Sequence, residues 1–108
     1  MKKQYDYKFF NITKLEAPKI VSVKINGTGH ITIETLNNLD LSNIKHTIKY
    51  SLIVNDNPEI VSEKNRIFIA KYLNEGTNNI IVKTILQVEN NEGKFVEFTY
   101  KKGTEIYV

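Results

Sequence analysis

Apolar and polar residues alternate with a period of two through most of this chain, and this pattern constrains the fold more than any other feature. Successive side chains of a β-strand point to opposite faces, so the alternation predicts strands with one buried face. The clearest run spans residues 47–54. Its apolar face consists of Ile48, Tyr50, Leu52 and Val54, and its polar face of Thr47, Lys49 and Ser51.

Further strands are predicted along the chain, separated by turn sequences and by an Asn-rich loop over residues 36–45. In the first of them, Val21, Val23 and Ile25 form the expected inward face. The predicted strands are 19–25, 31–34, 47–54, a short edge strand near 60–61, 67–69, 80–88 and 96–100. The last residues, 105–108, are compatible with either another strand or a tail.

Two of the turns predict hairpins. Asn26-Gly27-Thr28-Gly29 joins the first two strands, and an Asn-Gly pair tolerates the positive φ of a tight turn. Asn90-Asn91-Glu92-Gly93 joins the predicted strands 80–88 and 96–100. The segment 55–58 stops the clearest strand, because Asx residues favour turns and proline cannot donate to a ladder.

A helical repeat of apolar residues over three turns occurs nowhere, so the sequence predicts an all-β protein. A single sheet leaves an apolar face in water, and two sheets packed together remove it. We therefore expect a two-sheet, immunoglobulin-like sandwich of about seven strands over residues 18–108, preceded by an N-terminal arm over residues 1–17. A small oligonucleotide-binding type of barrel is the alternative fold, but the helix that it usually carries is not indicated.

The stretch 48–98 resembles bacterial and phage immunoglobulin-like modules of the fibronectin type III kind, and also the triple-tyrosine modules of bacterial proteins. The segment 48–52 is similar to their central strand, and 80–98 is similar to their final hairpin. Leu73-Asn74-Glu75-Gly76-Thr77-Asn78 is similar to the corner before their sixth strand. Many relatives have a tyrosine where this chain has Asn78, so its hydroxyl-to-backbone lock is missing or replaced here.

The composition narrows the class of function. The net charge of +3 comes almost entirely from lysine, with Arg66 as the only arginine, and nucleic-acid binding is not expected. The chain has no cysteine, so neither a disulfide nor a thiolate zinc site can form. It has no apolar run that would serve as a signal peptide or a membrane span.

Candidate catalytic and metal-binding residues are few. The two histidines, His30 and His46, are expected to be structural, because metal binding would require them to meet with carboxylates. Asp40, Asp56 and Glu59 lie in predicted loops where calcium sites occur, but turn formation explains them better. No nucleophile elbow or oxyanion loop accompanies the serine, histidine and aspartate residues. We therefore expect no enzyme, no metal and no cofactor.

Aromatic residues give the sharpest indication of a binding site. Tyr50, Phe98 and Tyr100 fall on inward positions and are expected in the core. The arm concentrates four more, which are too much apolar surface to leave in water. They are expected either to fold back on the sandwich or to dock on another chain, and they are Tyr5, Tyr7, Phe9 and Phe10.

These observations together predict a non-enzymatic structural or interaction module. If Met1 is the natural start, an accessory component of a larger assembly is expected, and by resemblance phage decoration or tail proteins are the nearest type. The alternative is a spacer, adhesion or carbohydrate-binding unit of a multidomain bacterial surface or secreted protein. The predicted location is a virion or a cell surface, with protein partners and a possible homo-oligomer. The outward positions carry no strip of aromatics, which counts against sugar binding; they include Lys49, Ser51, Lys83 and Gln87.

Overall fold

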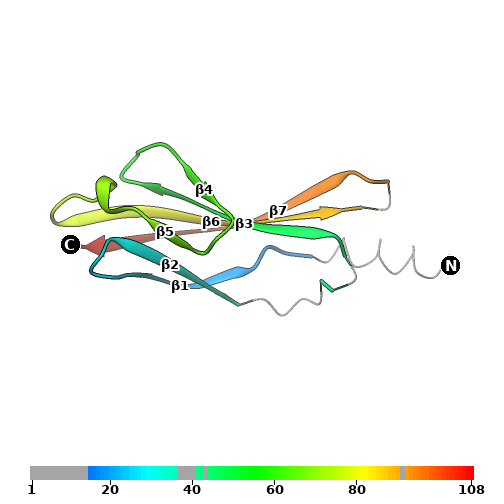
Figure 1. Cartoon of the computed structure of the whole chain (residues 1–108), viewed down its shortest axis with the longest axis horizontal. Coiled ribbons are helices and arrows are strands. Elements are labelled where there is room, and N and C mark those ends of the chain that lie inside the picture. Colours follow the sequence, from blue (N-terminus) through cyan, green and yellow to red (C-terminus); the bar gives the residue numbers. More distant parts are fainter. Residues whose placement is uncertain (1–14, 37–40, 43, 91) are drawn as a thin grey trace.

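The structure, a computed structural model, describes residues 15–36, 41–42, 44–90 and 92–108. Seven strands form two antiparallel sheets in these residues, which confirms the predicted all-β, two-sheet sandwich (Figure 1). One sheet has the order β1-β2-β5 and the other β4-β3-β6-β7. The strands are β1 (Lys19–Ile25), β2 (His30–Leu36), β3 (His46–Val54), β4 (Ile60–Ser62), β5 (Arg66–Phe68), β6 (Thr77–Glu89) and β7 (Phe95–Tyr107), with a 3-10 turn η1 (Ala70–Tyr72) before β6.

The main core lies between the inner faces of the two sheets. Within the strands, the inward positions other than Ile20 follow the alternation, and β-branched side chains suit this pleated, buried surface. The buried members are Ile20, Ile31, Ile33, Leu52, Val54, Ile67, Ile69, Ile80 and Val82.

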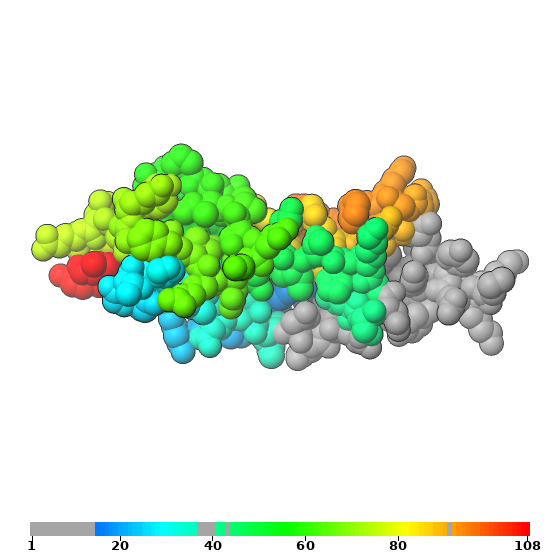
Figure 2. Space-filling view, in the orientation of Figure 1, coloured from blue at the N-terminus to red at the C-terminus, as the bar shows by residue number. Residues whose placement is uncertain are grey.

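A second core lies where β6 and β7 extend beyond the three-stranded sheet. The far end of their hairpin projects at the upper right of the molecule in Figure 2. The inner face of this extension is covered by residues 15–17 and by Leu41 and Ile44, which lie in irregular segments rather than in strands. The predicted loop residue Leu41 is therefore buried, whereas Leu39 lies outside the described residues. Buried in this cluster are Leu15, Ala17, Leu41, Ile44, Leu86 and Val88.

The prediction that Val21 points inward is wrong. The register between β1 and β2 pairs Ile20 with Thr35 and Ser22 with Glu34, so Val21 is an extra residue at a β-bulge. Ile20 takes the buried position and Val21 is 54% exposed. After the bulge the alternation resumes as predicted.

Both predicted hairpins form, and they close with the same chemistry. Asn26 and Asn90 each donate their backbone N–H to the carbonyl of the residue four positions later, and each accepts from the glycine three positions later. Positive φ is found at Gly29 and Gly93, not at Asn26 or Gly27 as the Asn-Gly pair suggested. This matches a turn followed by a left-handed residue, where glycine has no steric penalty.

The turn after β3 also uses left-handed residues. Asn55 and Asp56 have φ values of 49° and 64°, and the N–H of Asn57 donates to the carbonyl of Val54 at 2.9 Å. Positive φ at both central residues defines a type I′ turn, which Asn and Asp tolerate. Asp56 is therefore explained by the turn, as predicted.

Asn78, the second residue of β6, is fully buried. Its side-chain oxygen accepts from Asn55 Nδ2 at 2.6 Å and from the backbone N–H of Asn74 at 2.7 Å. Its nitrogen donates to the carbonyls of Asn74 and Gly76. The Asn78 amide thus locks the turn after β3 to the start of β6 through these hydrogen bonds.

Candidate interaction surface

The aromatic arm residues Tyr5, Tyr7, Phe9 and Phe10 lie outside the described residues. The last residues of the predicted arm are described, and they belong to the packed body. Leu15 is 7% and Ala17 is 5% exposed, and both pack in the second core. The carbonyl of Pro18 accepts a hydrogen bond of 2.6 Å from the buried hydroxyl of Thr84. An arm that reaches another chain would therefore have to lie before Leu15.

Within the described residues, β7 is an open edge. It pairs with β6 from Phe95 to Tyr107, and no backbone hydrogen bond joins it to a described residue outside this ladder and its continuation at Val108. The predicted strand at 96–100 and residues 105–107, which the sequence left as either a strand or a tail, are parts of this one 13-residue strand. An unpaired row of N–H and C=O groups of this length is a template for pairing with another strand.

The hydrogen-bond pattern shows which residues of β7 face the open side. The ladder is hydrogen-bonded at the pairs Asn90–Lys94 and Gly76–Val108, at its two ends. Because hydrogen-bonded pairs alternate along an antiparallel ladder, the even-numbered residues of β7 bond to β6. The odd-numbered residues therefore direct their N–H and C=O groups to the open edge. Their side chains stand on the outer face of the sheet, away from the core.

The outer face of the four-stranded sheet carries an aliphatic row that ends at this edge. Ile53 on β3 pairs with Ile81 on β6, which pairs with Gly103 on β7. Ile81 is 38% exposed. Gly103 has no atom within 4 Å of the position that a β-carbon would take. A hollow of about 470 Å³ lies beside these residues, lined by Asn79, Ile80, Ile81, Gly103, Thr104 and Glu105.

Polar contacts lie on the side of the aliphatic row that is nearer the β6–β7 hairpin turn. Lys83 Nζ lies 3.5 Å from a carboxylate oxygen of Glu59. The hydroxyl of Ser51 donates to the same carboxylate, and together Ser51 and Lys83 lower the pKa of Glu59 below its ordinary value. Ser51 is on the outer face as predicted, yet it is buried. Nearer the hairpin, Gln87 Nε2 donates to Glu97 at 3.1 Å.

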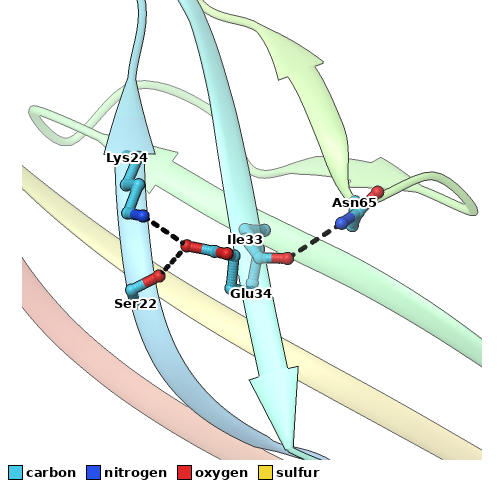
Figure 3. Close-up of polar contacts among 5 residues, drawn as sticks. All are labelled: Ser22, Lys24, Ile33, Glu34 and Asn65. Atoms are coloured by element: carbon cyan, nitrogen blue, oxygen red, sulfur yellow. Dashed lines mark hydrogen bonds and ion pairs between the residues drawn. The ribbon is translucent and has the colours of Figure 1, made fainter.

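The outer face of the three-stranded sheet carries a cluster of polar contacts rather than an aliphatic row. Glu34 accepts a hydrogen bond from the Ser22 hydroxyl, and it pairs with Lys24 at 3.1 Å (Figure 3). The Ser22 hydrogen bond, followed by the Lys24 contact, lowers the pKa of Glu34. On the other side of β2, Asn65 Nδ2 donates to the Ile33 carbonyl at 3.0 Å. These polar contacts join β1 to β2, and β2 to the residue that precedes β5.

The histidines do not meet. His30 belongs to the three-stranded sheet, with its Nδ1 2.8 Å from the Thr28 hydroxyl and its ring 5.0 Å from that of Phe68. His46 belongs to the other sheet, with its Nδ1 2.7 Å from the Ile44 carbonyl. In residues 15–36, 41–42, 44–90 and 92–108, no three metal-ligating side chains gather. Asp40 lies outside the described residues.

Exposed aromatic rings are scattered over the part of the chain that the structure describes. Phe68 stands on the three-stranded sheet, whereas Phe95 and Tyr107 stand at opposite ends of β7. Tyr50, Phe98 and Tyr100 pack against the core clusters, as their inward positions predicted.

Sequence reasoning missed Phe95 and Gly103, and both had a detectable signal. A glycine inside a strand pattern marks a bulge or a close approach by another group. The register shows no bulge at Gly103. Phe95 directly follows a hairpin and stands in the outward set of its strand, where a polar residue is the norm.

Comparison with known proteins finds no match among family models, curated proteins or solved structures. Among the described residues, no helix has the length and apolar character needed to cross a membrane.

Proposed function

We propose that this chain is a non-catalytic module that binds protein, and that it serves as an accessory component of a larger assembly such as a phage virion. The observation that carries the proposal is the open edge of β7 beside the outer-face row of Ile53, Ile81 and Gly103, in which Ile53 is half-buried and Ile81 and Gly103 are exposed. Strand addition at an open edge supplies affinity through the backbone, and neighbouring side chains supply specificity. The resemblance of the sequence to immunoglobulin-like modules also supports a non-catalytic, protein-binding function.

A variant pair tests this surface in the native assembly. Ile81→Glu places a charge in the aliphatic row, whereas Val21→Glu makes the same change at an exposed position of the opposite sheet. We expect Ile81→Glu to remove the chain from particles or complexes isolated from its native source, and Val21→Glu to leave it there. Equal incorporation of both variants would contradict the proposed surface.

The mass of the protein in its native source distinguishes a free-standing accessory protein from a domain of a larger surface protein. A mass near 12.5 kDa, recovered in a particle, supports a free-standing accessory protein. A much larger mass supports the alternative, a spacer or adhesion unit within a bacterial surface protein. Carbohydrate binding is the competing class of function, and saturable chemical-shift changes at Phe68, Phe95 or Tyr107 with oligosaccharides would favour it.

A further inference from the structure

We propose that the partner of the β7 edge is a second copy of this chain, paired antiparallel with its own β7 about a twofold axis at Thr99. This inference rests on the proposed function, since it names the partner of the same surface. Pairing of the two edges would join the two four-stranded sheets into one continuous sheet. This register places residues of complementary charge and shape opposite one another.

The backbone permits this register. Thr99 is odd-numbered, so its N–H and C=O face the open edge, as do those of Phe95, Glu97, Lys101 and Gly103. Antiparallel pairing about Thr99 sets each of these residues opposite another member of the same set. Two residues that both face the shared edge exchange two backbone hydrogen bonds. Every backbone N–H and C=O group that faces the edge between Phe95 and Gly103 is therefore hydrogen-bonded in this register.

Charges match in this register. Glu97 of each copy stands opposite Lys101 of the other, so the symmetry creates two ion pairs on the outer face. Opposite charges directly across an antiparallel pair are stabilising, and like charges are destabilising. Within its own chain, Glu97 already accepts from Gln87, which holds the carboxylate on this face.

Shape matches as well. Phe95, which is 59% exposed, stands opposite Gly103 of the second copy. On its far side Gly103 pairs with Ile81, and the hollow of about 470 Å³ lies beside them. An aromatic ring laid across a strand glycine covers the backbone that the glycine leaves open. Phe95 would thereby extend the aliphatic row of Ile53 and Ile81, and its ring would become buried from solvent.

The other face of the joined strands adds aromatic contacts. Phe98 of each copy stands opposite Tyr100 of the other, at pairs that are not hydrogen-bonded and whose side chains approach most closely. Both rings are only partly buried in the single chain. A groove of about 370 Å³ beside them, lined by Leu15, Glu16, Ala17, Lys19, Phe98, Thr99 and Tyr100, leaves room on this side.

Neighbouring registers lose these matches. An axis at Lys101 sets Lys101 against itself and Glu97 against Glu105. An axis at Gly103 pairs Lys101 with Glu105, but it leaves Phe95 with no residue of β7 opposite. The register about Thr99 alone of these three combines opposite charges with an aromatic ring over Gly103.

Charge reversal of the full chain tests the proposal. Sedimentation equilibrium from about 1 µM to about 1 mM protein covers the range of a weak association. We expect the mass to rise from 12.5 kDa toward twice that value. Glu97→Lys and Lys101→Glu each turn two attractive pairs into two repulsive ones, so each should weaken dimerisation at least about tenfold. Glu63→Lys and Lys64→Glu, exposed in the turn before β5, are controls with the same changes of net charge.

Mixing the two variants gives the decisive result. One copy then carries lysine at both positions and the other glutamate at both, so both cross-strand pairs become attractive. We expect the mixture to recover dimers that neither variant forms alone. This recovery also shows that each variant is folded.

Three outcomes would overturn the inference. These are a chain that stays monomeric over the whole range, a dimer that tolerates both charge reversals, and a mixture that fails to recover. None of them bears on the incorporation test with Ile81→Glu and Val21→Glu in the native assembly. The self-pairing and the proposed function can therefore fail separately.

Discussion

Gly29 lies so close to Ala70 that a β-carbon on Gly29 would stand 3.0 Å from the Ala70 Cα and nearer still to its Cβ. Gly29 also has a φ of 82°, and its carbonyl accepts from the N–H of Ile69 at 2.9 Å. The turn between β1 and β2 therefore packs directly on the 3-10 turn η1 before β6. Gly93, in the other hairpin, has nearly the same φ as Gly29. A comparison of the two glycines therefore separates the effect of the positive φ from the effect of the close contact with Ala70.

Gly29→Ala should destabilise the protein far more than Gly93→Ala. Both substitutions place a β-carbon at positive φ, which costs about 1 kcal/mol. Only Gly29→Ala adds a clash with backbone, whereas the nearest atom to a β-carbon on Gly93 is a Glu89 side-chain oxygen at 3.8 Å. We expect a total loss of about 3 kcal/mol or more for Gly29→Ala in chemical denaturation. Similar losses for the two variants would refute the role of the contact.

Asn78→Leu should cost about 3 kcal/mol of unfolding free energy. The side chain is fully buried, and its loss strands the N–H of Asn74 and the carbonyls that its nitrogen now satisfies. Unpaired buried polar groups cost about 1–3 kcal/mol each. Asn79→Leu, at the exposed neighbouring position, is the control and should change stability by less than about 0.5 kcal/mol. Equal denaturation midpoints for the two variants would show that the lock contributes nothing.

Thr84→Val should loosen the segment that leads into β1. Valine keeps the shape of threonine but leaves the Pro18 carbonyl without its donor, at a cost of about 1–2 kcal/mol. Hydrogen exchange at Leu15 and Ala17 should accelerate more than exchange in β6. Thr84→Ser keeps the hydroxyl and should preserve the protection of this segment. Unchanged exchange at Leu15 and Ala17 in Thr84→Val would argue against the anchor.

Acid should remove the small stabilisation that Glu34 and Glu59 provide. The pKa of each is lowered in the folded state, by Ser22 with Lys24 and by Ser51 with Lys83 respectively. A lowered pKa gives stability that is present above the unfolded value, about pH 4.3, and is lost as the pH falls through the folded value. Glu34→Gln should therefore be less stable than the natural chain at pH 7 and equal to it near pH 2.

Salt provides the control for this pH effect. Both carboxylates are exposed, so 1 M NaCl should reduce the difference between the natural chain and Glu34→Gln at pH 7. Thermal unfolding at several pH values and two salt concentrations measures both effects. A difference between the two proteins that persists at pH 2 would mean that the glutamine acts through packing rather than charge.

The deletion that tests the aromatic arm follows from the second core. Because Leu15 and Ala17 are buried and Pro18 is anchored, removal of residues 1–14 rather than 1–16 preserves the described body. That truncated chain is the one in which loss of a partner would report on Tyr5, Tyr7, Phe9 and Phe10.

The local sequence pattern was sufficient to predict most of the strands, both hairpins and the sandwich class. Alternation along β3 and the Asn-rich turns at residues 26–29 and 90–93 are local signals, since each depends on neighbours a few residues away. The inward positions of Leu52 and Val54 followed from the same local pattern.

Residues that depart from that pattern are set by contacts between segments distant in the chain. The bulge that turns Val21 outward exists because of the register that β1 takes on β2, and the burial of Asn78 and Thr84 depends on the distant partners Asn55 and Pro18. The open edge also required the strand order, because Phe95 and Gly103 face it only when β7 pairs with β6 alone among the described residues. Such choices arise from contacts between segments far apart in the chain, whose energies a local pattern does not contain.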